Sequence, residues 1–146
     1  MFVAVDQTNL LQAATVHAIS WRESHRSFCP VDFVDLHTPE RQREYMLKKL
    51  AAGSRFYLLV EDDPIGVVSV SGCLIEDLYI LPDKQGMGYG TALLRFAIGN
   101  CTGTPTLWVL ENNVKARRLY RRMGFRETGA VHTVPGGFDE IELALT

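Results

Sequence analysis

The chain has 146 residues, of which 47% are hydrophobic and 22% charged, and its formal net charge is −2. This is ordinary globular composition at a length typical of one domain, so we expect a single domain over residues 1–146 rather than a disordered or fibrous chain. The balanced charge gives no electrostatic reason to expect binding to nucleic acid or to an acidic membrane surface.

The first part of the chain predicts one strand and two helices. Residues 2–5 alternate weakly and indicate a strand, and Thr8 is placed to cap a helix with a broad apolar face that extends to about Trp21. Residues 31–36 are expected to form a loop. Thr38 and Pro39 form a strong helix start, and that second helix should end at Gly53.

The remainder predicts six strands and two helices. The strands are expected at 55–60, 65–71, 73–81, 106–110, 125–132 and 138–145, and the helices at about 90–99 and 113–122. The turn residues 61–64 should join the first two of these strands as a hairpin, and Pro135-Gly136-Gly137 should join the last two. The resulting order, β-α-α-β-β-β-α-β-α-β-β, predicts an α/β fold of the α+β type with a mixed sheet.

The three cysteines and the N-terminus indicate the cellular context. Cys29, Cys73 and Cys101 are too few and too scattered for a disulfide framework or a zinc site, so we expect no metal. The sequence shows no secretory leader and no apolar run of membrane-spanning length. We therefore expect a cytoplasmic protein that makes no use of a membrane.

The most informative stretch is a strand followed by a glycine-rich loop and a helix. Pro82 ends the strand, and Gly86, Gly88 and Gly90 alternate before the helix begins. Backbone N–H groups at a helix N-terminus lack helical partners, and the helix dipole adds partial positive charge. Because glycine has no Cβ, a phosphate could lie directly against this backbone. The pattern therefore predicts an anion site.

The loop has two alternative interpretations, a turn without a ligand and a dinucleotide-binding site. A glycine-rich turn without a ligand has the same local composition. A dinucleotide-binding fingerprint requires G-x-G-x-x-G, whereas the spacing here is G-x-G-x-G, and no strand with an acidic end follows about twenty residues later.

Two blocks of the sequence resemble the GNAT superfamily of N-acetyltransferases. Residues 85–90, QGMGYG, fit the Q/R-x-x-G-x-G/A signature of that family, and residues 78–82 resemble its fourth strand. Residues 113–125 resemble the family's N-x-x-A…Y…G-F segment, and the two blocks occur in the expected order. The resemblance covers roughly the second half of the chain, and it implies the GNAT fold with splayed fourth and fifth strands.

The resemblance implies that acetyl-CoA is the co-substrate. Backbone N–H groups of the loop would bind its pyrophosphate, the backbone of the fourth strand would bind its pantetheine arm, and Asn113 would either cap a helix or contact that arm. The implied cofactor-binding residues are Leu78, Tyr79, Ile80, Gln85, Gly86, Met87, Gly88, Tyr89, Gly90, Thr91, Asn113 and Tyr120. Among the arginines at 117, 118, 121 and 122, one could meet the 3′-phosphate, although a solvated helix face is the ordinary interpretation.

The same resemblance assigns the catalytic roles. Tyr120 occupies the position of the family's general acid, which protonates the departing thiolate after an amine attacks the thioester directly. Glu76 is a candidate general base, since strand alternation places it on the same face as Leu78 and Ile80, with Asp77 on the other face. Glu111 is a further candidate for the base, and some GNAT enzymes need none.

The acceptor is expected to be a primary amine of a small molecule, a protein N-terminus or a lysine. In the family, the end of the first helix and the loop after it form a wall of the acceptor site, which points to Trp21, Arg22, His25 and Phe28. Such an aromatic and basic group would suit an acceptor with an apolar body and an acidic group. His17 is expected to be a buried, hydrogen-bonded histidine rather than a base.

Two further possibilities concern assembly and catalysis. An exposed edge strand near residues 138–145 would permit a homodimer. A non-catalytic acyl-CoA-binding sensor or regulatory module would need the same glycine loop, but it would need neither Tyr120 nor an open acceptor site.

Overall fold

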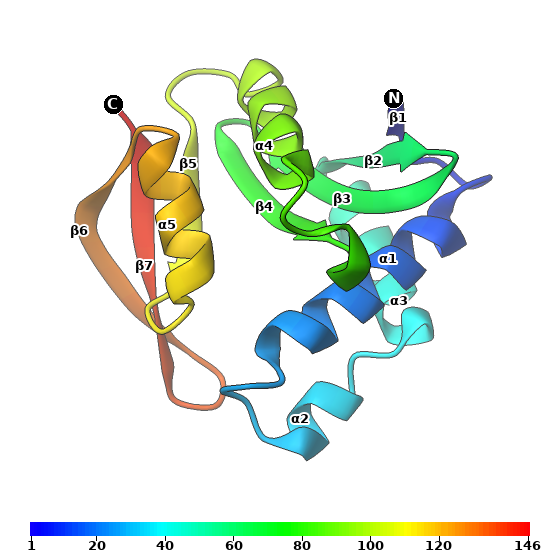
Figure 1. Cartoon of the computed structure of the whole chain (residues 1–146), viewed down its shortest axis with the longest axis horizontal. Helices are drawn as coiled ribbons and strands as arrows, with labels where there is room; N and C mark the ends of the chain where they lie inside the picture. The colour runs from blue at the N-terminus through cyan, green and yellow to red at the C-terminus, as the bar shows by residue number, and fades with distance from the viewer.

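The computed structural model describes all residues from 1 to 146 and contains a seven-stranded sheet with helices on both faces (Figure 1). The elements are β1 (Phe2–Ala4), α1 (Leu10–His25), α2 (Val31–Asp35), α3 (Pro39–Ala51), β2 (Arg55–Glu61), β3 (Asp63–Ser71), β4 (Leu74–Ile80), the short 3-10 helix η1 (Pro82–Lys84), α4 (Tyr89–Gly99), β5 (Thr106–Leu110), α5 (Val114–Arg122), β6 (Phe125–Val134) and β7 (Phe138–Leu145). The order agrees with the predicted one except for α2. No helix combines the length and the apolar character that crossing a lipid bilayer requires.

The sheet has the strand order β1-β2-β3-β4-β5-β7-β6 and is mixed, which confirms the predicted fold class. Only β4 and β5 are parallel neighbours, because α4 forms the crossover between them. Alternate residues of β3 face two different hydrophobic clusters: Val68 and Val70 pack with α4 and α5, whereas Val67 packs with α1 and α3. The sheet is therefore covered on both faces in its central part.

Two local expectations for the N-terminal part were wrong. Residues 31–35 form a helix rather than a loop, and five residues are too few to show a helical period in the sequence. Asn9, not Thr8, is the residue at the N-cap of α1, because the Thr8 hydroxyl donates instead to the Asp6 carboxylate. The predicted start of α3 is confirmed, since Thr38 Oγ1 accepts the Arg41 N–H at 3.3 Å.

The strands β4 and β5 splay apart, as the family resemblance implied. They pair only at Leu74–Thr106 and Ile75–Leu107, although β4 continues to Ile80 and β5 to Leu110. Figure 1 shows the two strands diverging below this point, with α4 and α5 on either side of the opening. Beyond Ile75, the edge of β4 that faces β5 is therefore free of a strand partner.

A β-bulge at Asp77 overturns the predicted faces of β4. Asp77 has a positive φ of 55°, and the register with β3 moves from Ser69–Glu76 to Val67–Tyr79, which inserts one extra residue in β4. Glu76 therefore shares a face with Tyr79, not with Leu78 and Ile80. Alternation along a strand predicts faces only where no residue is inserted, so the sequence pattern could not show this change.

The expected edge strand was also misplaced. The segment Phe138–Leu145 is β7, which lies between β5 and β6 and is therefore internal. The edge is β6, whose residues from Arg126 to Thr133 are all exposed. In a hairpin at the end of a chain, either strand can be the outer one, and only the pairing of β7 with β5 decides which one is.

Candidate active site

The glycine loop between η1 and α4 presents a row of free donors. The N–H groups of residues 86–91 make no hydrogen bond within the protein, and the first helical bond of α4 is donated by Ala92 to Gly88 O at 3.1 Å. Gly86 and Gly88 have φ values of 78° and 86°, which L side chains rarely adopt, and a Cβ at either position would enter open space. The loop is therefore shaped as an anion cradle at a helix N-terminus.

Gln85 anchors this loop to two other elements. Its Nε2 donates to Ile80 O at 3.1 Å, and its Oε1 accepts from Lys115 Nζ at 2.7 Å. Gly90 lies where α4 passes close to α5, since a Cβ there would meet Leu119 Cδ2 at 3.6 Å. These contacts hold the loop between the end of β4 and the start of α5, and sequence reasoning missed Lys115 as a partner.

The other implied loop residues lie around the same helix N-terminus. Met87 is 62% exposed, while Tyr89 and Thr91 are half-buried in the first turn of α4. On β4, Leu78 packs on the cluster under α4 and α5, and Ile80 is buried in it. The backbone of this part of β4 is the unpaired edge that faces β5.

Asn113 caps α5, which was one of its two predicted roles. Its Oδ1 accepts the Ala116 N–H at 3.3 Å, so the side chain is the helix cap. About two turns later on the same helix, Tyr120 is buried and its ring lies 6.1 Å from that of Phe125, edge to face. Burial raises the pKa of Tyr120 to about 12, so the phenol is protonated at neutral pH.

Tyr79 of β4 lies near residues of both α1 and α5. Its pKa is raised well above the usual value, first by burial and then by the negative charge of Asp77 and by the neighbouring Tyr120 hydroxyl. Its ring lies 5.0 Å from that of His17 and 6.4 Å from that of His25. The tyrosine therefore reaches from the splayed strands to helix α1.

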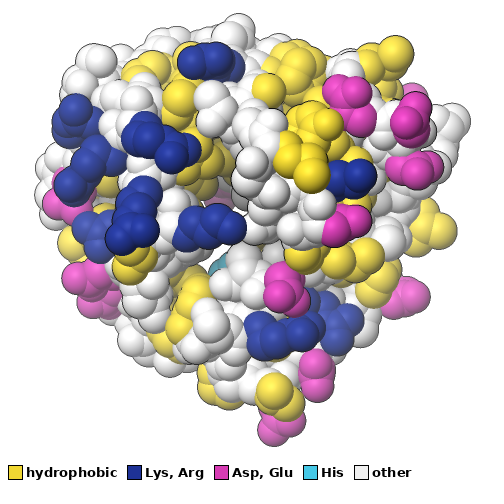
Figure 2. Space-filling model, viewed as in Figure 1, with side chains coloured by type: hydrophobic (Ala, Val, Ile, Leu, Met, Phe, Trp, Pro, Cys, Tyr) yellow, Lys and Arg dark blue, Asp and Glu magenta, His cyan; other side chains and the backbone are white.

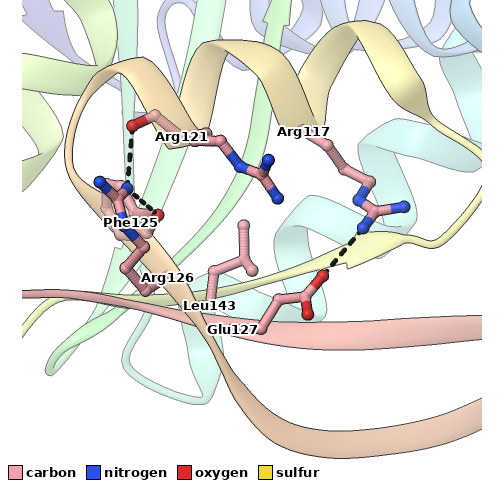
Figure 3. Close-up of a pocket in the computed structure, with 6 residues that line it drawn as sticks. All are labelled: Arg117, Arg121, Phe125, Arg126, Glu127 and Leu143. Atoms are coloured by element: carbon pink, nitrogen blue, oxygen red, sulfur yellow. Dashed lines mark hydrogen bonds and ion pairs between the residues drawn. The ribbon is translucent and has the colours of Figure 1, made fainter.

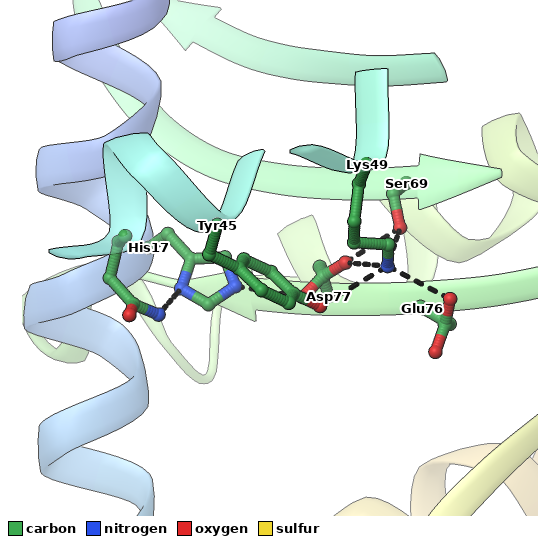
Figure 4. Close-up of polar contacts among 7 residues, drawn as sticks. His17, Tyr45, Lys49, Ser69, Glu76 and Asp77 are labelled. Atoms are coloured by element: carbon green, nitrogen blue, oxygen red, sulfur yellow. Dashed lines mark hydrogen bonds and ion pairs between the residues drawn. The ribbon is translucent and has the colours of Figure 1, made fainter. Parts of the chain in front are cut away.

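A polar cluster surrounds the Asp77 carboxylate on the α1 and α3 side of the sheet (Figure 4). Oδ1 accepts from His17 Nε2 at 2.8 Å and from Tyr45 Oη at 2.9 Å, and Oδ2 accepts from Lys49 Nζ and Ser69 Oγ, both at 2.7 Å. Burial alone would raise the pKa of Asp77, but the hydrogen bond and charge of His17 and the charge of Lys49 outweigh it and hold the pKa well below its usual range. The carboxylate is therefore ionised and fully paired.

Glu76 joins this cluster only through Lys49. Lys49 Nζ donates to Glu76 Oε1 at 2.8 Å, and the Glu76 side chain is 38% exposed, compared with 7% for Asp77. His17 is buried and bonded at both ring nitrogens, since Gln42 Nε2 donates to its Nδ1 at 2.8 Å. The structure thus confirms His17 as a hydrogen-bonded buried residue, and it shows Lys49 and Tyr45 as partners that no sequence signal marked, because they come from a helix distant in sequence.

The expected acceptor residues form an aromatic group at the end of α1. Trp21 stacks between His25 at 3.9 Å and His37 at 3.4 Å, and the Phe28 ring lies 6.4 Å from Phe138 at the start of β7. In Figure 1 the turn between β6 and β7 lies next to the loop that joins α1 to α2. The group therefore borders the same side of the sheet as Tyr79.

The basic members of this group do not form an anion site. The Arg22 guanidinium is paired with Asp35 at 3.5 Å. Burial lowers the pKa of His25 to about 4, with the neighbouring His37 contributing in the same direction against the hydrogen bond to Trp21 O. His25 is therefore neutral at neutral pH, and neither it nor the paired Arg22 favours an acidic group on the acceptor.

Two arginines of α5 lie on the side of the helix that faces β6. A hollow of about 380 Å³ between α5 and β6 is lined by Arg117, Arg121 and Arg126, with Phe125, Glu127 and Leu143 (Figure 3). Arg117 donates there to Glu127 at 2.8 Å. Lys115 instead faces Gln85 and the glycine loop. Arg117 and Arg121 are therefore poorly placed to meet a phosphate at that loop.

Positive charge is concentrated on one side of the surface. Figure 2 shows Lys and Arg side chains gathered where α5 lies, and the surface is hollowed between this side and α1. No group of three or more His, Cys, Asp or Glu side chains is arranged to hold a metal ion.

Comparison with known proteins agrees with this geometry. Residues 52–127 match the family described as acetyltransferase (GNAT) domain. This range contains the glycine loop, the splayed strands, Asn113 and Tyr120. The chain belongs to the GNAT family.

Individual GNAT proteins show how far the similarity extends. The peptidyl-lysine N-acetyltransferase YjaB of Salmonella typhimurium is 36% identical over 69 residues, which are 47% of this chain and 47% of that protein. The chain thus spans about half the length of this curated relative in the alignment.

Solved structures extend the likeness of the fold to nearly the whole chain. The apo form of YjaB from Escherichia coli superposes with a TM-score of 0.71 at 20% identity, covering 100% of this chain and 97% of that one. The PaiA N-acetyltransferase of Thermoplasma acidophilum in complex with coenzyme A gives a TM-score of 0.71 at 16% identity, covering 97% and 96%. At these identities the comparison shows the fold.

Proposed function

We propose that this GNAT protein is an acetyl-CoA-dependent N-acetyltransferase that moves an acetyl group to a primary amine by direct attack. The observation that carries the proposal is the row of free N–H groups from Gly86 to Thr91 beside the unpaired edge of β4. A diphosphate needs several donors and little steric bulk, and a strand edge without a partner suits the amides of a pantetheine arm.

The residues present fit this co-substrate. The glycine loop would bind the diphosphate, with Lys115 adding a positive charge beside it, and the backbone of residues 78–80 would bind the arm. The thioester supplies an activated acetyl group. The chain itself has to hold that group, exclude water and manage two protons.

Tyr120 is proposed as the general acid. It is held on α5 next to the opening between β4 and β5, and with a pKa of about 12 it carries its proton at neutral pH. A thiolate leaving group requires such a donor at its sulfur atom. Tyr79, whose pKa is raised by burial and which lies beside Tyr120, is protonated as well and lines the same space.

Glu76 is proposed as the general base. It is more exposed than Asp77, and it has a single side-chain partner in Lys49. Asp77 is unsuited to accept a proton, because all of its four contacts are donors and its pKa is held low. A base is required because an attacking amine must lose a proton.

A lysine side chain is the acceptor we would test first. The relative that matches over 47% of its length is named a peptidyl-lysine N-acetyltransferase, and Glu76, which is 38% exposed, is the accessible carboxylate beside the proposed acceptor. We propose that His25 and Phe28 border the acceptor, since they lie against Tyr79 and Phe138 respectively, with Trp21 and Arg22 supporting them from α1. A small-molecule amine is the alternative acceptor.

Thiol release from acetyl-CoA tests the proposal directly. A lysine-containing peptide, free lysine and spermidine would be offered separately, and mass spectrometry would identify an acetylated product. Amine-dependent thiol release with a product heavier by one acetyl group is expected. Tight binding of coenzyme A without release for any amine would favour a non-catalytic acyl-CoA-binding module.

A further inference from the structure

Asp77 adopts a backbone conformation that an aspartate in a strand does not adopt without support. Its φ of 55° lies in the left-handed region, in the middle of β4, and Asp62 is the only other residue besides glycine with a positive φ. Residues other than glycine remain in this region only where the surroundings hold them there. The bulge therefore requires an explanation outside the local sequence.

The side chain of Asp77 supplies this explanation. Its two oxygens accept four hydrogen bonds, from His17 on α1, Tyr45 and Lys49 on α3, and Ser69 on β3. With only 7% of the side chain exposed, the carboxylate is locked among three elements that are themselves packed together (Figure 4). A backbone shift at Asp77 would break several charge-assisted hydrogen bonds at once.

The bulge lies where β4 leaves β5. The last pair between these strands is Ile75–Leu107, two residues before Asp77, and the next residues, 78–80, have no partner on β5. The bulge also decides which residues of β4 face the two layers, since Tyr79 lies on the α1 side and Ile80 in the cluster under α4. The conformation of one residue therefore sets the position of the backbone at the opening.

We propose that Asp77 is a positioning residue, whose carboxylate, anchored by His17, Tyr45, Lys49 and Ser69, holds the bulge that presents the β4 backbone to the thioester. This inference rests on the proposed acetyl transfer. Asp77 does not exchange a proton with the substrates. It acts through the backbone of residues 78–80, so its loss should impair turnover more than the affinity for coenzyme A, because the free N–H groups of residues 86–91 that would hold the diphosphate are left in place.

The main test is Asp77→Asn. Asparagine keeps the shape and tolerates positive φ, but its amide nitrogen cannot accept hydrogen bonds from Lys49 or Ser69. We expect kcat to fall by about tenfold or more, since small misplacements of reacting groups are costly, while the Kd for coenzyme A changes by less than about threefold. Glu127→Gln, which removes a surface carboxylate paired with Arg117, is the matched control and should leave both values unchanged.

Two variants with single donors removed cover the case in which Asp77→Asn does not fold. Ser69→Ala and Tyr45→Phe each delete one hydrogen bond to the carboxylate and should lower kcat to a smaller extent, again without a matching loss of affinity for coenzyme A. Equal losses of kcat and coenzyme A affinity, or a kcat within about twofold of the wild type in every folded variant, would overturn the proposal.

Hydrogen exchange separates this proposal from the proposed function. If the wild-type protein released no thiol with any amine, the acetyl transfer would fail, but exchange of the amides of residues 78–80 would still report on the bulge. Faster exchange there in Asp77→Asn than in the wild type, with the β2 amides unchanged, supports the anchoring role. Unchanged exchange at residues 78–80 overturns it.

Discussion

Lys115 Nζ donates to Gln85 Oε1 at 2.7 Å and so ties the first turn of α5 to the glycine loop before α4. The two residues are thirty positions apart, and each comes from one of the two sequence blocks that resemble the GNAT family. Gln85 in turn holds Ile80 O at the end of β4. The loop, the strand and the second helix therefore form one frame around the proposed diphosphate site.

This contact leads to a prediction for Lys115→Met. The change removes a positive charge beside the loop and the partner of Gln85, so the Kd for coenzyme A should rise by about twofold to fivefold at low salt, as expected for one exposed charge. Isothermal titration calorimetry would measure it. Arg121→Met is the control on the same helix, since Arg121 lines the hollow towards β6, and the Kd should stay unchanged. An equal effect of both changes would show that only net charge matters.

Gly88→Val should abolish binding of coenzyme A while leaving the protein folded. Valine at a φ of 86° introduces strain of about 1–2 kcal/mol, and its side chain would fill the space above the free N–H groups. Because each charge-assisted hydrogen bond contributes about 1.5–3 kcal/mol, the Kd should rise by about a hundredfold or more.

Gly103 offers the matched control for this strain. It has a φ of 78° and nothing within 4 Å of its Cβ position, but it lies in the loop before β5. Gly103→Val should therefore lower the melting temperature to a similar extent and keep the affinity for coenzyme A. Retained affinity in Gly88→Val would remove the loop from the binding site.

Tyr120→Phe should lower kcat by about a hundredfold, within the range of general acid catalysis, and leave the Kd for coenzyme A nearly unchanged. The pKa of about 12 means that the acid is present at every pH below that value, so no loss of activity from Tyr120 is expected between pH 7 and pH 10. Steady-state kinetics over this range would check both points. A turnover unchanged by the substitution would exclude Tyr120 from the mechanism.

His25 should make folding stability depend on pH. Burial lowers its pKa to about 4 in the folded protein, whereas a histidine in an unfolded chain has its usual pKa of 6.5. The unfolded state therefore binds more protons between these values, so stability is complete above pH 6.5 and declines as the pH falls towards 4, by at most about 3 kcal/mol. Chemical denaturation at several pH values would measure the decline.

His25→Gln should flatten this dependence relative to the wild type. His132→Gln is the control, because His132 is 48% exposed and is paired with Glu140 on the surface. If the wild type and His25→Gln lost stability in parallel between pH 6.5 and 4, the buried histidine would not be the cause.

Several features of the site could be predicted from residues adjacent in sequence. The alternating glycines at 86, 88 and 90 predicted the donor cradle, because positive φ and the absence of a side chain are properties of glycine itself. Thr38 before Pro39 predicted a capped helix start, and Asn113 predicted the cap of α5, because caps are local hydrogen bonds.

Two of the wrong predictions concern features that depend on a strand distant in sequence, and a third concerns a short helix. The face of Glu76 depends on one inserted residue in β4, and the edge of the sheet depends on β7 pairing with β5 rather than lying outermost. The helix α2 is too short for its period to be visible. In each of these three cases, the nearby sequence is compatible with both the predicted and the observed structure.

By itself, the sequence determined the order of the elements other than α2, the glycine loop before α4 and the helix that carries Tyr120. The tertiary structure alone decided that Asp77 is anchored by side chains of α1, α3 and β3, and that Lys115 reaches Gln85. The physical reason is that glycines, prolines and caps act on their own backbone. A buried carboxylate is stable only if donors from remote segments converge on it, and the folding of the whole chain brings them together.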